Sequence, residues 1–151
     1  MNRGKIKPIS VRIAVHVHAT EDEEKVIKAI RNVLPPNLKI KLSREVISGH
    51  YGNPIIRLEA FIRNKKEAEA IFRWIMSKIE GFLYPNWISE RFDSSTKTLY
   101  IRLDKQVAYL GNIKLGWGDD IIHISFKFPG YFSFSPEELE KEIEMLRKGS
   151  D

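Results

Sequence analysis

The sequence predicts an α+β fold in which one mainly antiparallel sheet packs on helices on one face. Two observations predict this class. Five segments alternate apolar and polar residues with the period of two that is typical of half-buried strands, and three longer segments carry apolar residues at helical spacing behind an N-cap residue. The expected order is βαββα(α)ββα, within a single domain that spans residues 1–151.

The first strand is expected over residues 11–17, where apolar and polar residues alternate. Thr20 stands three residues before Glu23, as in a capping box, and predicts the start of a helix. The two prolines at 35–36 should end this helix, because proline lacks the amide donor that a helix interior requires.

A hairpin and a second helix are expected next. Residues 38–42 and 56–62 both alternate, and turn-forming residues lie between them, so we expect two paired strands with a long exposed tip. Asn64 with Glu67 repeats the N-cap pattern and predicts a helix that ends at Gly81.

The remaining sequence indicates two further strands and a last helix. Residues 85–92 favour a short helix, and residues 99–103 and 122–128 alternate as strands. The connection over residues 105–120 is long for a hairpin, so we expect a turn of helix within it. Residues 135–138 form a capping box with proline at the first helical position, which predicts the last helix.

The composition limits the chemistry. The 151 residues include no cysteine, which excludes disulfides, cysteine-ligated zinc, iron–sulfur clusters and cysteine nucleophiles. No window resembles a membrane helix or a signal peptide, so we expect a cytoplasmic protein without a membrane partner. A single glutamine among many isoleucines is typical of thermophilic proteins.

Charge is unevenly distributed along the chain, whose net charge is +5. Residues 1–135 carry 22 Lys/Arg against 14 Asp/Glu, whereas residues 136–151 carry 3 against 6. A basic body with an acidic tail attracts polyanions, nucleic acid above all, because each phosphate contact releases condensed counterions.

A basic face of the predicted sheet is the main functional indication. If the apolar positions pack on the helices, the alternate positions share the opposite face. These positions are Arg12, His16, His18, Lys39, Lys41, Arg57, Glu59, Tyr100, Arg102, His123 and Lys127. Six cations against one carboxylate, with an aromatic ring and three imidazoles, resemble surfaces that bind RNA by phosphate contacts and base stacking. The alternative is a solvated face without a ligand.

Two loops are candidate additions to this surface. His50 and Tyr51 lie between glycines that permit an exposed conformation, so Tyr51 could stack on a base or fold back over the hairpin end. In the loop after residue 104, Lys105 suits a phosphate, Gln106 a base edge or ribose, and Tyr109 an unpaired base.

Metal sites are alternative interpretations of some polar residues. His16 and His18 point the same way from one strand, and with His123 they would suit zinc. Asp119, Asp120 and His123, with Asp104 upstream, could hold a divalent metal such as Mg²⁺, as in a nuclease. No spacing enforces either convergence, and a turn explains the two aspartates equally well. We therefore expect no metal, no cofactor and no catalytic residue.

Four segments together resemble a known family. They are HATEDEEKVIKAI (18–30), GHYGNPI (49–55), RLDKQVAYLG (102–111) and DDIIHISFK (119–127). In this order they resemble the archaeal RNA-binding family described as predicted exosome subunits. The family pattern before the last strand is GDGDD, and here Trp117 replaces the small acidic residue.

The resemblance implies a fold similar to that of the ribosomal large-subunit protein that binds 5S RNA. It also implies RNA binding without known catalysis, and a link to the exosome through gene context. The sequence therefore predicts a non-enzymatic RNA-binding protein, accessory to the exosome or to RNA processing. The alternatives are a protein-interaction subunit of an RNA-processing assembly, docked by its acidic last helix, and a metal-dependent nuclease.

Overall fold

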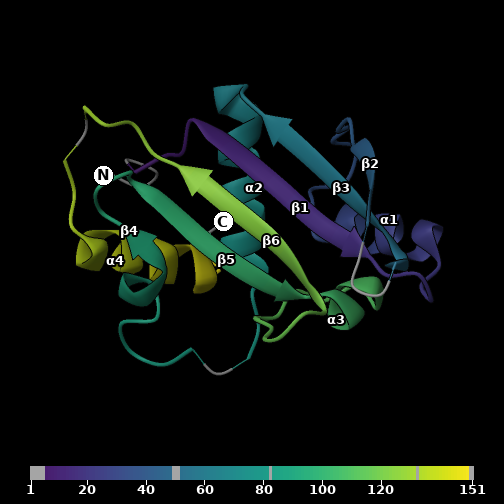
Figure 1. Cartoon of the computed structure of the whole chain (residues 1–151). Helices are drawn as coiled ribbons and strands as arrows, with labels where there is room; N and C mark the ends of the chain where they lie inside the picture. The colour runs from purple at the N-terminus through teal and green to yellow at the C-terminus, as the bar shows by residue number, and fades with distance from the viewer. Residues whose placement is uncertain (1–5, 49–51, 82, 132, 150–151) are drawn as a thin grey trace.

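The computed structural model describes residues 6–48, 52–81, 83–131 and 133–149. In these ranges the strands form one sheet in the order β2-β3-β1-β6-β5-β4, and every neighbouring pair is antiparallel (Figure 1). The strands are β1 (Ser10–Val17), β2 (Ser43–Ser48), β3 (Pro54–Ile62), β4 (Phe92–Asp93), β5 (Thr98–Asp104) and β6 (Ile121–Lys127). The predicted α+β class with a mainly antiparallel sheet is confirmed.

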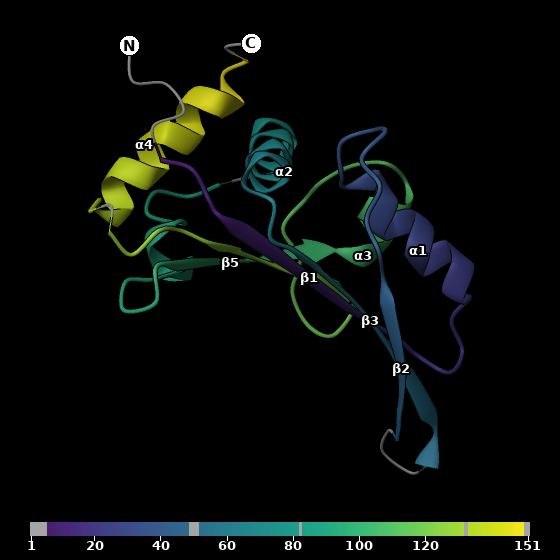
Figure 2. The ribbon, with the colours of Figure 1, turned by 90° about the horizontal axis from the view of Figure 1, so that it is seen from above.

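The helices gather on one face of this sheet, as expected. They are α1 (Glu23–Asn32), α2 (Lys65–Lys78), α3 (Lys105–Tyr109) and α4 (Pro136–Arg147). Seen from above, α1, α2 and α4 lie on one side of the strands, and the other side of the sheet carries no helix from the described ranges (Figure 2). None of the described helices has the length and apolar character needed to cross a membrane.

The core fills the space between the sheet and its helices. The ring of Phe72 in α2 meets the rings of Phe126 and Phe128 edge to face, at centroid distances of 5.2 and 5.6 Å. All three side chains are almost fully buried, and burial of each such side chain contributes about 1.5–3 kcal/mol. Because the apolar positions of the strands are committed to this core, the alternate positions must face away from the helices.

The prediction of a strand over residues 38–42, as the first strand of the hairpin, is wrong. Residues 38–42 form no strand, and Leu38, Ile40 and Leu42 pack partly buried against the core from an irregular segment. β2 follows instead and pairs with β3 from Ser43 opposite Glu59 onward. Alternation of polar and apolar residues indicates an extended chain that lies on an apolar surface. A strand also needs a hydrogen-bonded neighbour, and residues 43–48 take the place beside β3.

The helix boundaries are predicted best where a capping side chain is present. Asn64 accepts from Glu67 N at 3.0 Å, and Ser135 forms the expected capping box. The N-cap of α1 is Asp22 rather than Thr20. Two other expectations also need correction, since α2 ends at Lys78 instead of Gly81 and the expected helix at 85–92 is a turn with a three-residue 3-10 helix.

Candidate nucleic-acid interface

The helix-free face, called the open face below, brings together most of the polar residues expected there. Strand register places His16 opposite Arg57 on β3, and it places His123 between Ala14 of β1 and Arg102 of β5. These residues come from four neighbouring strands. The sequence prediction of a shared face is therefore confirmed for these positions.

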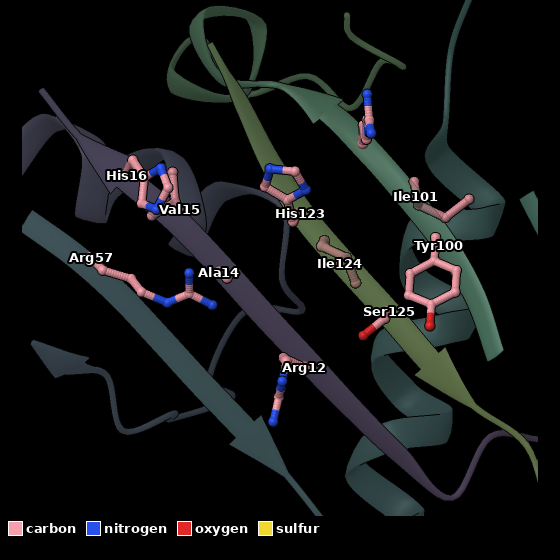
Figure 3. A pocket seen from close by; sticks show the side chains of 11 residues that line it. Arg12, Ala14, Val15, His16, Arg57, Tyr100, Ile101, His123, Ile124 and Ser125 are labelled. Carbon is pink, nitrogen blue, oxygen red and sulfur yellow. The ribbon is translucent and has the colours of Figure 1, made fainter. Parts of the chain in front are cut away.

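A cleft with a volume of about 350 Å³ opens on this face. Figure 3 shows its side chains projecting from β3, β1, β6 and β5 around the small side chain of Ala14. Its lining residues are Arg12, Ala14, Val15, His16, Arg57, Tyr100, Ile101, Arg102, His123, Ile124 and Ser125. Small side chains at its centre and long cationic ones around them make a basic depression.

Three arginines dominate the charge of the cleft. Arg12 Nε and one terminal nitrogen of Arg57 lie 3.3 and 3.5 Å from the same Glu59 carboxylate oxygen. Exposed ion pairs of this kind contribute at most about 1 kcal/mol, so a phosphate can replace Glu59 as a partner at little cost. Arg102 lines the opposite side of the cleft.

The two histidines of the cleft hold protons weakly. Burial is the largest cause that lowers the pKa of His16 below its ordinary value of 6.5, followed by the charge of Arg57. Burial and the charge of Arg102 likewise lower the pKa of His123. Both imidazoles are therefore neutral at pH 7 in the free protein, and a bound phosphate would favour their charged form.

Exposed aromatic rings stand at both ends of one row across the sheet. In register, this row runs Phe61, Arg12, Ser125 and Tyr100. The exposed fractions are 49% for Phe61 and 52% for Tyr100. The Arg12 and Arg63 guanidinium carbons lie 5.5 and 4.8 Å from the centroid of the Phe61 ring. Sequence reasoning missed Phe61, although it lies four residues after Arg57 on β3 and therefore on the same face.

Some of the expected cations lie elsewhere. The predicted places of Lys39 and Lys41 on a sheet strand are wrong, because both belong to the irregular segment before β2. His18 lies just beyond the end of β1 and does not line the cleft. Lys127 lies on the open face, as expected, since it follows Ser125 by two residues on β6, but it does not line the cleft, and its Nζ donates to Thr96 O at 2.7 Å.

Lys105 is the clearest correction. Its side chain is only 2% exposed, and its Nζ donates to His16 O and Glu21 Oε1, both at 2.9 Å. Asp120 Oδ1 lies 3.2 Å from the same ammonium. A lysine that is buried and already held by two carboxylates is not presented to a phosphate.

The rest of the α3 region also departs from the prediction. Gln106 Nε2 donates to Asp120 Oδ2 at 3.0 Å, so this exposed amide already has a partner. Tyr109 packs against the core, with Lys28 Nζ of α1 5.2 Å from the centre of its ring. α3 therefore joins α1 on the helix side and does not extend the open face.

Two further candidates cannot be placed, and the metal hypotheses gain no support. His50 and Tyr51 lie outside the described residues. Across the described ranges, no group of three His, Asp or Glu side chains could hold a metal ion. Of the two candidate aspartates, Asp120 binds Lys105 and Gln106.

Comparison with known proteins points to RNA. A family model described as RNA binding matches residues 10–128. RNA-binding protein PAB1135 from Pyrococcus abyssi is 34% identical over 154 residues, which cover 98% of this chain and 99% of that protein. Both names indicate RNA binding rather than catalysis.

Solved archaeal structures have a similar fold. The crystal structure of protein AF2318 from Archaeoglobus fulgidus, assigned to DUF54, is 33% identical with a TM-score of 0.71, and the match covers 94% of this chain and 99% of that one. The DUF54 protein Mth689 from Methanothermobacter thermautotrophicus is 30% identical with a TM-score of 0.69, covering 94% and 97%. Since the family model spans most of the chain and a relative is similar over its full length, this chain belongs to the RNA-binding family found in these archaea.

Proposed function

We propose that the protein binds RNA without catalysis, and that the cleft on the open face is the contact surface. The observation that carries this proposal is the convergence of Arg12, Arg57, Arg102, His16 and His123 on a face that no described helix covers. Guanidinium groups bind phosphate oxygens through two parallel hydrogen bonds. Family membership supports RNA as the polyanion.

Base stacking adds to the phosphate contacts in this proposal. Phe61 and Tyr100 are three strand spacings apart, which is about 14 Å. Bases on these two rings cannot stack on each other, so the strand must be unpaired and splayed. Recognition of splayed bases on aromatic rings is the usual way in which proteins bind single-stranded RNA.

The direct test is a titration with single-stranded RNA, duplex RNA and duplex DNA at about 50 and 200 mM salt. We expect the tightest binding to single-stranded RNA, with affinity falling as salt rises. Equal affinity for all three polymers would indicate general attraction to polyanions. Absence of RNA binding at the lower salt concentration would reject the function itself.

RNA affinity should depend on pH through the two cleft histidines. Their pKa values are lowered in the free protein, and phosphate favours the imidazolium, so binding takes up protons. Affinity should therefore rise about threefold to tenfold as the pH falls from about 8 to about 5.5. The paired substitutions His16→Asn and His123→Asn should flatten this dependence, whereas His18→Asn should keep it. An unchanged pH profile in the double variant would contradict phosphate contact at the histidines.

We infer that an accessory role with the exosome or another RNA-processing assembly is compatible with this surface. Docking of a partner protein through the acidic residues of α4 is less well supported than RNA binding by the open face, because two of these residues already have partners within the chain. Glu140 accepts from the backbone of Asn86 and Ile88, and Glu144 pairs with Arg147. Cytoplasmic location and heat adaptation stay predictions from composition.

A further inference from the structure

A second pocket opens beside the cleft, between β5 and residues 84–93. Its volume is about 460 Å³, within the range of small-ligand sites. Tyr100 and Arg102 line both this pocket and the cleft. An RNA strand whose phosphates lie in the cleft can therefore place its next nucleotide in the pocket without leaving the surface.

Two aromatic rings form part of the pocket wall. Tyr100 comes from β5 and Trp117 from the loop before β6, and the exposed fraction of Trp117 is 71%. Both rings are more than half exposed, and both offer flat faces on which a base can stack.

The position of Trp117 is fixed by the backbone. Gly116 N donates to Arg102 O at 2.9 Å, and Asp104 N donates to Lys114 O at 2.8 Å, so the loop lies directly along β5. A Cβ on Gly116 would come within 2.8 Å of the Asp104 backbone. The absence of a side chain at residue 116 thus permits the close approach that brings the next residue to the pocket.

Two carboxylates, Glu90 and Asp93, also line the pocket, together with two cations, Arg91 and Arg102. Glu90 already accepts from the hydroxyl of Tyr84, which leaves Asp93 as the carboxylate to consider for a ligand. Asp93 Oδ1 accepts from Ser95 N at 3.0 Å and from Ser95 Oγ at 2.7 Å, and these bonds lower the pKa of Asp93. The group stays ionised at neutral pH and can only accept hydrogen bonds. A ligand edge that meets Asp93 should therefore present N–H donors.

We propose that this pocket holds an unpaired nucleobase that bears an exocyclic amino group, stacked on Tyr100 and Trp117 with its amino edge toward Asp93. The inference rests on the proposed function and adds a base preference to it. A duplex hides the faces of its bases, so only an unpaired nucleotide can enter. Uracil would direct a carbonyl oxygen at the carboxylates, whereas cytosine offers its N4 amino group at the same place.

The test compares ten-nucleotide C-only and U-only single-stranded RNAs. Cytosine carries an amino donor on C4, whereas uracil carries a carbonyl oxygen there and an N–H at the neighbouring N3. We expect the wild-type protein to bind the C-only RNA about tenfold more tightly. Trp117→Ala should weaken both complexes about 5- to 150-fold while leaving their salt dependence unchanged. Asp93→Asn should narrow the preference for cytosine.

The matched control is Tyr131→Ala, which removes another exposed aromatic ring away from the pocket. It should bind both RNAs like the wild type. If Trp117→Ala behaves like this control, or if the U-only RNA binds as well as the C-only RNA, the pocket inference is wrong while RNA binding through the cleft still stands. If the wild-type protein binds neither RNA, the proposed function fails as well.

Discussion

Replacing Arg12, Arg57 and Arg102 together by alanine should lower the affinity for single-stranded RNA about 100-fold at low salt. Each guanidinium lines the cleft, and each lost phosphate contact removes about 1 kcal/mol or more of binding free energy. Because each contact with a single strand contributes about 0.7 to the slope of log K against log[salt], that slope should fall by about 2.

A second triple variant controls for net charge. Lys66 and Arg73 of α2 and Lys141 of α4 lie on the helix side, and their replacement by alanine removes the same three charges. This variant should bind RNA within about threefold of the wild type with an unchanged salt slope. Equal losses in both triple variants would mean that overall charge, and not the open face, drives binding. Circular dichroism should show both variants folded.

Lys105→Met should destabilise the fold by about 2–3 kcal/mol. Methionine cannot donate to His16 O, and it leaves Glu21 and Asp120 without their cation. The loss should be smaller than the 3–5 kcal/mol typical of a fully buried pair, since Glu21 is 19% and Asp120 47% exposed. For a domain of this size the melting temperature should drop by about 5–10 °C.

The same variant separates a structural role from an RNA-contact role. At a temperature where it is folded, Lys105→Met should keep its RNA affinity within about twofold and its salt slope unchanged. Gln106→Ala, the exposed neighbour, should change stability by less than about 1 kcal/mol. A stable Lys105→Met protein with weakened RNA binding would restore the original assignment of Lys105 to a phosphate.

The alternation of polar and apolar residues along the strands was enough to predict most of the open face from the sequence. Side chains alternate strictly between the two faces of a strand, so Arg12 and His16 had to share a face, as did Tyr100 and Arg102. β6 pairs with both β1 and β5, so these two pairs of residues lie on either side of its His123 and Ser125. Capping side chains were equally informative at Asn64 and Ser135, because an N-cap depends on local chain geometry.

Contacts between distant segments explain what the sequence could not reveal. Lysine is normally exposed, and the burial of Lys105 depends on Glu21 and His16, which are 84 and 89 residues away in the chain. Strand order was also unknown, so nothing in the sequence placed residues 38–42 outside the sheet. The second pocket is a similar case, since it needs the loop around Gly116 to lie along β5.

Mapping the RNA contact by backbone and side-chain NMR tests the central claim most directly. On addition of a short single-stranded RNA, the largest chemical-shift changes should fall on Arg12, His16, Tyr100, Arg102 and His123 of the open face. Resonances of α2 and α4 should change little. Changes concentrated on those helices, with the residues of the cleft unaffected, would show that RNA binds elsewhere on the molecule.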